Sequence, residues 1–220
     1  MTVQLFANKL TADKIAKVKQ VSDALNINHN WLLAVMYFES GKTFNPSIKN
    51  GIGSVGLIQF TRDKSGVNYK TINGKRYLLD DLAKMSFIQQ MDVVHEYYKE
   101  VYRMLKVNKL NSFVDLYLCT FFPKAVGQPL DYVFQTSGLS ASKIASQNPI
   151  FDKNKDNKIL KSEVVNHFQT YYKTVFNEIN IPNNSGVSSS IDKICAYCKQ
   201  ALPYILPVML FFYTYVTVIQ

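Results

Sequence analysis

The chain has few of the residues that build covalent or metal-bonded scaffolds. Its 220 residues include only three cysteines and three histidines. Three cysteines are too few for a disulfide framework, and the scattered histidines lack the ligand spacing of a zinc site. Cys195 and Cys198 have the spacing of a redox or half-zinc motif, but we favour two small residues on a short helix. Stability therefore has to come from a hydrophobic core, for which 47% hydrophobic content is sufficient.

The sequence also lacks two kinds of targeting or binding signal. Residues 1–10 have no charged start followed by a long apolar run, so we expect no secretory signal. The formal net charge of +9 favours an anionic partner such as nucleic acid, a lipid surface or an acidic wall polymer. Because no Lys/Arg run with interleaved aromatic residues is present, we expect no nucleic-acid binding.

The spacing of apolar residues predicts a mainly helical fold with one small β element. Thr11 can cap a first helix that continues to Leu25. Residues 31–38 are apolar on every side, which indicates a buried helix with Glu39 at its last turn and Gly41 at its end. Further helices are expected over residues 80–106, 111–122 and 164–178.

The β element is expected between Val67 and Leu78. Two alternating runs meet there at Asn73-Gly74, which is a strong signal of a hairpin with a type I′ turn. The fold class that follows is mainly α with a small β-hairpin, a helical C-terminal subdomain and an apolar C-terminal tail.

Changes in composition divide the chain into three parts. Residues 1–179 form the expected folded domain, and residues 180–191 form a linker rich in Asn, Ser, Pro and Gly. Residues 192–220 are an apolar tail without a charged residue after Ala201, and this length suits a bilayer span. Pro203 and Pro207 break helix near its start, so docking of the tail on its own domain is the alternative. We favour a membrane anchor.

Residues 152–163 have the spacing of an EF-hand calcium loop. Oxygen side chains stand at loop positions one, three and five, an apolar residue at eight and a glutamate at twelve. Asn157 replaces the usual glycine, but asparagine tolerates the left-handed conformation better than most residues. We therefore expect bound Ca2+, and the alternative is a solvated loop that caps the next helix. The expected ligands are Asp152, Asn154, Asp156, Lys158 and Glu163.

Three short motifs follow one another around Glu39. They are Glu39-Ser40, then Phe44-Asn45-Pro46, then Gly53-x-x-Gly56-Leu57-Ile58-Gln59. A lone glutamate at the end of an apolar helix, before a glycine-rich turn, indicates an active site. The ordered set resembles the soluble lytic transglycosylases, which cleave the glycan strands of bacterial peptidoglycan, and the related goose-type lysozymes. The resemblance covers about residues 15–178, is strongest over 31–60, and implies a lysozyme-like α+β fold.

The resemblance implies a general acid at Glu39 acting on the β-1,4 bond between N-acetylmuramic acid and N-acetylglucosamine. Burial would raise the pKa of Glu39 because the ionised form is desolvated. In this family the C6 hydroxyl of N-acetylmuramic acid attacks its own anomeric carbon, which leaves a 1,6-anhydro product, and the same glutamate acts as base. The implied substrate-binding residues are Ser40, Gly56, Leu57 and Gln59.

One family feature is missing. The family carries a tyrosine hydroxyl near the glutamate, within a motif whose counterpart here is the segment 119–125, and Phe121 has no hydroxyl. Tyr117 and Tyr132 are the expected substitutes in the substrate site.

Two other functions stay open. A hydrolytic lysozyme on the same fold would need a second carboxylate, for which Asp63 and Asp80 are candidates only by nearness in sequence. A non-catalytic glycan-binding or structural virion membrane protein would keep the fold without the chemistry. The missing secretion signal and the apolar tail favour an enzyme carried by a phage virion, held by its tail in a membrane and acting on the cell wall in the periplasm.

Overall fold

The computed structural model describes residues 9–171. In this part of the chain, helices dominate and a single two-stranded antiparallel sheet is present, which confirms the mainly helical prediction. The predicted linker (180–191) and apolar tail (192–220) lie outside the described residues. Among residues 9–171, no helix is both long and apolar enough to cross a membrane. The elements are α2 (Ala12–Ala24), α3 (His29–Glu39), β1 (Tyr69–Ile72), β2 (Lys75–Leu78), α4 (Leu79–Lys84), α5 (Phe87–Leu105), α6 (Phe113–Phe121), η1 (Pro123–Ala125), α7 (Ala141–Gln147) and α8 (Lys161–Tyr171).

Local capping explains where several helices begin. The Asn28 side chain accepts a hydrogen bond from the Asn30 N–H at 2.9 Å and starts α3. Thr11 stands at the N-cap of α2, but its side chain makes no capping hydrogen bond, unlike the expected cap. The helical segment expected over 80–106 consists of two helices: α4 has its C-cap at Met85, and a reciprocal capping box of Ser86 and Gln89 begins α5.

The hairpin forms as predicted and is tied to α5. Tyr69 pairs with Leu78 and Ile72 with Lys75, while Asn73 and Gly74 both have positive φ, as a type I′ turn requires. The Asn73 side chain donates to the Glu96 carboxylate at 2.7 Å, so the tip of the hairpin is held against α5.

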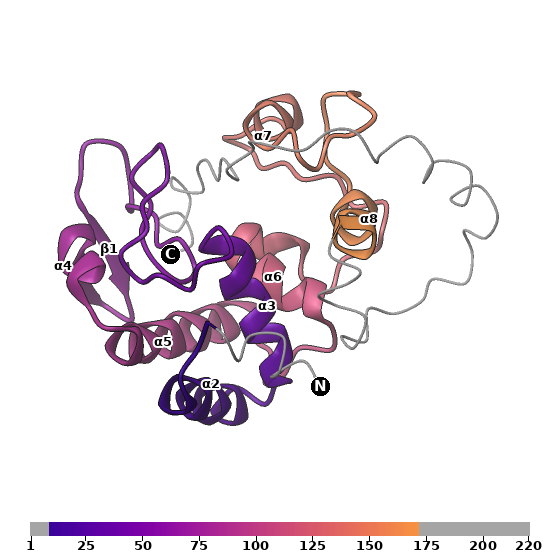
Figure 1. The fold of residues 1–220 in the computed structure, drawn as a ribbon. Helices are drawn as coiled ribbons and strands as arrows, with labels where there is room; N and C mark the ends of the chain where they lie inside the picture. Colours follow the sequence, from indigo (N-terminus) through magenta and orange to yellow (C-terminus); the bar gives the residue numbers. More distant parts are fainter. Residues whose placement is uncertain (1–8, 172–220) are drawn as a thin grey trace, which may run out of the picture.

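Helix α3 runs through the centre of the fold (Figure 1). It packs against α2 and α6, while α5 packs against α2 and β1. On the other side, the aromatic rings of Phe38, Tyr117 and Phe168 join α3, α6 and α8, with centroids 4.7–5.5 Å apart. The residue that precedes Glu39 is therefore fixed in the aromatic core.

Candidate active site

Glu39 ends α3 as a buried and unbonded carboxyl group. The residue is 3% exposed, and neither carboxylate oxygen has a hydrogen-bond partner within residues 9–171. Burial raises the pKa of Glu39 well above its usual value, because the charged form loses its hydration without gaining a compensating bond. Burial therefore favours the protonated form of the side chain, which is the form that can give a proton away.

The turn that follows Glu39 is held by hydroxyl groups. The Ser40 Oγ accepts the Phe44 N–H at 2.8 Å, and the Thr43 Oγ1 donates to the Ser40 carbonyl at 2.6 Å. Ser40 therefore shapes the turn and makes no hydrogen bond to the Glu39 carboxyl. Lys42 and Phe44 have φ of +69° and +55°, a costly conformation for non-glycine residues that surrounding contacts must stabilise.

The glycine-rich turn brings Gly56, Leu57 and Gln59 together as predicted. Val55 and Phe60 exchange two backbone hydrogen bonds of 3.0 and 2.7 Å that close the turn. Gln59 is 7% exposed, has a φ of +54°, and donates its side-chain amide to the Gly56 carbonyl at 3.0 Å. Its Oε1 has no donor among the described residues, so this acceptor is available to a ligand.

Sequence reasoning missed Gln90 of α5, which contacts this turn. Its Oε1 accepts the Leu57 N–H at 2.7 Å. Gln90 belongs to no recognised motif and lies 33 positions from Leu57, so only the folded structure reveals the contact.

The two tyrosines expected near Glu39 lie elsewhere. Tyr117 is fully buried in the aromatic core against Phe38 and Phe168, and the half-buried Tyr132 lies beside Phe122 and Phe134. Tyr117 thus serves packing, which corrects its expected place in the substrate site.

Two other tyrosines, both on α5, lie near Glu39. Burial and the nearby charges of Cys119, Glu100 and Glu39 raise the pKa of Tyr97. Burial also raises the pKa of Tyr98, and the charge of Glu39 adds to the effect. The Tyr97 hydroxyl donates to the Cys119 carbonyl at 3.0 Å. These two hydroxyl groups near Glu39 therefore come from α5, and neither tyrosine belongs to a recognised sequence motif.

The two carboxylates considered for hydrolysis are both engaged. Asp63 lies 3.6 Å from the buried Lys70 ammonium and accepts the Thr71 N–H at 3.0 Å. Asp80 accepts hydrogen bonds from Lys49 at 2.7 Å and Asn68 at 3.1 Å, and these bonds lower its pKa. Both groups stabilise loops around the hairpin.

The loop 152–163, where calcium is expected, adopts a turn built from its own side chains. The Asp152 and Asn154 oxygens both accept the Asp156 N–H at 3.1 Å, and Glu163 accepts the Leu160 N–H at 2.8 Å. Burial and the charges of Asp156 and Asp152 raise the pKa of Glu163, which places the three carboxylates near one another. Over residues 9–171, no three His, Cys, Asp or Glu side chains are arranged closely enough to hold a metal ion.

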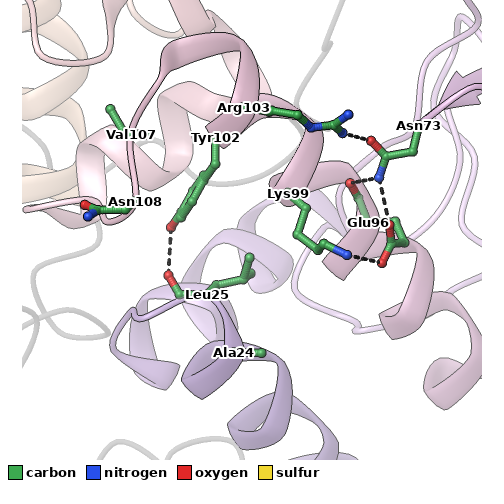
Figure 2. A pocket seen from close by; sticks show the side chains of 9 residues that line it. All are labelled: Ala24, Leu25, Asn73, Glu96, Lys99, Tyr102, Arg103, Val107 and Asn108. Atoms are coloured by element: carbon green, nitrogen blue, oxygen red, sulfur yellow. Dashed lines mark hydrogen bonds and ion pairs between the residues drawn. The ribbon is translucent and has the colours of Figure 1, made fainter.

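A hollow of about 540 Å³ lies between α2, α5 and the hairpin tip, away from the predicted site (Figure 2). Its polar groups bond to one another: Lys99 donates to Glu96 at 3.0 Å, and Arg103 donates to Asn73. Tyr102 donates to the Leu25 carbonyl at 3.2 Å on the opposite wall. None of the predicted catalytic, substrate or calcium residues lines this hollow.

No protein-family model matches the chain, and neither a curated protein nor a solved structure is significantly similar to it. The resemblance to lytic transglycosylases therefore stays a prediction from the motifs around Glu39. The functional argument rests on the geometry of these residues.

Proposed function

We propose that the protein is a peptidoglycan lytic transglycosylase with a lysozyme-like fold, in which Glu39 is the general acid. The observation that carries the proposal is the burial of an unbonded Glu39 carboxyl, with its pKa well above the usual value. A general acid must still hold its proton at the working pH, and glycosidic cleavage needs that proton on the leaving oxygen. An exposed or ion-paired glutamate would be ionised and could not supply it.

The reaction proceeds in two proton transfers. Glu39 gives its proton to the glycosidic oxygen, the bond to C1 of N-acetylmuramic acid breaks, and N-acetylglucosamine leaves with a free C4 hydroxyl. The C6 hydroxyl of N-acetylmuramic acid then bonds to C1, and its proton returns to the Glu39 carboxylate. The protein is regenerated and the glycan ends in a 1,6-anhydro ring, with no water consumed.

The glycine turn supplies the polar contacts to the sugar. The Gln59 Oε1 accepts a hydrogen bond from a sugar hydroxyl or N-acetyl N–H, and Gly56 and Leu57 form the turn that carries Gln59. Ser40 contributes by fixing the Phe44 turn.

The engagement of Asp63 and Asp80 favours ring closure over hydrolysis. A hydrolase would need a carboxylate to activate water or to stabilise the sugar cation. Asp63 is paired with Lys70, and Asp80 is paired with Lys49. A hydrolytic lysozyme is therefore the second candidate, and a non-catalytic glycan-binding virion protein is the third.

The test is digestion of purified peptidoglycan followed by mass spectrometry of the fragments. We expect anhydro-ended fragments from the wild type and a loss of lysis in Glu39→Gln. Asp131→Asn, which removes one exposed negative charge, is the control and should cut normally. Reducing ends would favour a lysozyme, and lysis retained by Glu39→Gln would remove Glu39 from the mechanism.

We also propose that loop 152–163 binds Ca2+ as a structural ion. The residues fit the group: Asn157 has the left-handed φ of +63° that this loop position requires, and burial together with the charges of Asp156 and Asp152 raises the pKa of Glu163. A bound Ca2+ would stabilise these charges, and the chemistry at Glu39 does not involve it. Lys158 would contribute its backbone carbonyl oxygen at position seven.

The setting that we propose is a phage virion. The enzyme would be carried in the particle, anchored through residues 192–220, and would open the cell wall in the periplasm at infection. The net charge of +9 supports an acidic wall polymer as partner. Fractionation of purified virions tests this setting, and export of the protein by its own host cell would contradict it.

A further inference from the structure

Gln90 is a fully buried amide on α5 that joins three separate segments. Its Oε1 accepts the Leu57 N–H at 2.7 Å. Its Nε2 donates to the carbonyl of Pro46 at 2.9 Å and to the carbonyl of Leu82 at 2.8 Å. One side chain therefore connects the Phe44-Asn45-Pro46 turn, the glycine turn and the end of α4.

The same amide explains why position 56 is a glycine. A Cβ atom added to Gly56 would lie 2.3 Å from the Gln90 Oε1 and 2.6 Å from its Nε2. Such contacts are far shorter than non-bonded atoms allow, and Gly56 also has a φ of +88°. The glycine of the motif is thus matched to a residue that stands outside the motif.

Only an amide of this length fulfils these contacts. Gln90 uses one acceptor and two donors, all of them buried, so each would cost free energy if left unpaired. Glutamate at this position could accept from Leu57 but would lack the two donors. Methionine would fill the space without making any of the three hydrogen bonds.

We propose that Gln90 is a positioning residue that sets the backbone of the turn after Glu39 and of the glycine turn. The proposal rests on the proposed function for the role of these turns. Phe44 and Gln59 hold φ of +55° and +54°, and residues in this region persist only when surrounding contacts determine them. Gln90 supplies such contacts to both turns, and it does not touch the acid itself.

The test compares Gln90→Met with Gln89→Met in the full chain. Gln89 is the neighbouring glutamine, and its side chain only accepts the Ser86 N–H at the start of α5. We expect the Leu57 amide hydrogen to exchange faster with solvent in Gln90→Met and to stay protected in Gln89→Met. Peptidoglycan cleavage should fall on the order of a hundredfold in Gln90→Met, the loss that a misplaced site can cause. The pH profile should keep its shape, because Glu39 is unchanged.

The readouts separate this proposal from the proposed function. Exchange at Leu57 tests the anchoring even if the wild type does not cut peptidoglycan. If Gln90→Met fails to fold, Gln90→Glu replaces it, and Leu57 should stay protected while cleavage falls. Normal cleavage in a folded Gln90→Met, or an unchanged Leu57 exchange rate, would overturn the proposal.

Discussion

The turns around Glu39 and the loop 152–163 both contain residues with left-handed backbone, but different contacts stabilise them. Both hold non-glycine residues at positive φ: Phe44 and Gln59 near +55°, and Lys155 and Asn157 near +60°. The turns near Glu39 have local support from Ser40 and Gln59, and they are also held by Gln90, which lies 33 and 44 positions from the groups that it bonds. In the loop 152–163, the supporting side chains lie only two to four positions from the backbone groups that they bond.

This difference separates tertiary from local control. The loop 152–163 can form its turn from contacts within its own sequence, and a bound cation would stabilise that turn. The Glu39 region also depends on α5 being in place, because the buried amide of Gln90 bonds both turns. We therefore expect mutations near Glu39 to affect the whole fold or the chemistry, and mutations in the loop to have smaller, local effects.

The largest contrast should come from removing one carboxyl group in each region. Glu39→Gln should lower peptidoglycan cleavage on the order of a thousandfold, as loss of a general acid does, while Glu163→Gln should leave cleavage within about twofold of the wild type. Initial cleavage rates on purified peptidoglycan measure both. Equal losses of cleavage rate in the two variants would contradict a catalytic role for Glu39 and a purely structural role for Glu163.

The wild type and Glu39→Gln should differ in how their thermal stability changes with pH. The folded pKa of Glu39 lies above its ordinary value of 4.5, so above that pH the unfolded state gains by ionising and the folded state does not. The wild type therefore loses stability as pH rises above about 4.5, and Glu39→Gln should melt higher than the wild type at pH 7 but not at pH 4. Melting temperatures at both pH values decide this.

Alanine at two left-handed glycines should separate remote contacts from backbone strain. Gly56 and Gly66 have φ of +88° and +81°, but an added Cβ would meet Gln90 only at Gly56 and nothing within 4 Å at Gly66. We expect Gly66→Ala to cost about 1 kcal/mol of unfolding free energy from strain alone. Gly56→Ala should cost about 3 kcal/mol, because overpacking adds to the strain. Urea unfolding measures both, and equal costs would exclude a role for the Gln90 contact.

The buried His167 should make the stability of the fold depend on pH. Its ring packs against Phe38 and Phe168, and burial lowers its pKa from 6.5 to about 4. Since the unfolded state takes up the proton first, stability should fall as pH drops from 6.5 to 4, by about 3 kcal/mol at 1.36 kcal/mol per pKa unit. His167→Phe should remove this part of the loss. If the stability of His167→Phe falls with pH as much as that of the wild type, His167 is not the group responsible for the loss.

Removal of calcium should have the smallest effect. If loop 152–163 binds Ca2+, excess Ca2+ stabilises the folded state by about 2 kcal/mol for a concentration some thirtyfold above the dissociation constant. EDTA should then lower the melting temperature of the wild type but not that of Glu163→Gln, whose position-twelve ligand is altered. No change in the wild type would count against the calcium site.

The sequence predicted those features whose determinants lie close together in the chain. The hairpin at Asn73-Gly74 and the positive φ of Asn157 follow from local turn preferences. The burial of Glu39 follows from the apolar run before it. The break before α5 was also readable, because Ser86 and Gln89 have capping-box spacing.

The determinants that escaped prediction come from tertiary contacts. Gln90 and Tyr97 belong to no motif, and only the packing of α5 brings them to the glycine turn and to Glu39. Tyr117 was assigned to the substrate site by its position near segment 119–125, but the side of α6 on which it lies faces Phe38 and Phe168. Sequence spacing cannot give the rotation of one helix relative to another.

The central claim is that burial keeps Glu39 protonated at neutral pH, and its most direct test is an NMR titration of the Glu39 carboxyl carbon. The wild-type protein, labelled with 13C in glutamate, is titrated from pH 3 to pH 9, with Glu39→Gln used to assign the signal. We predict no ionisation step for Glu39 near pH 4.5 and a signal still protonated at pH 7. An ordinary step near pH 4.5 would contradict the account, because the group would then be ionised when the reaction needs its proton.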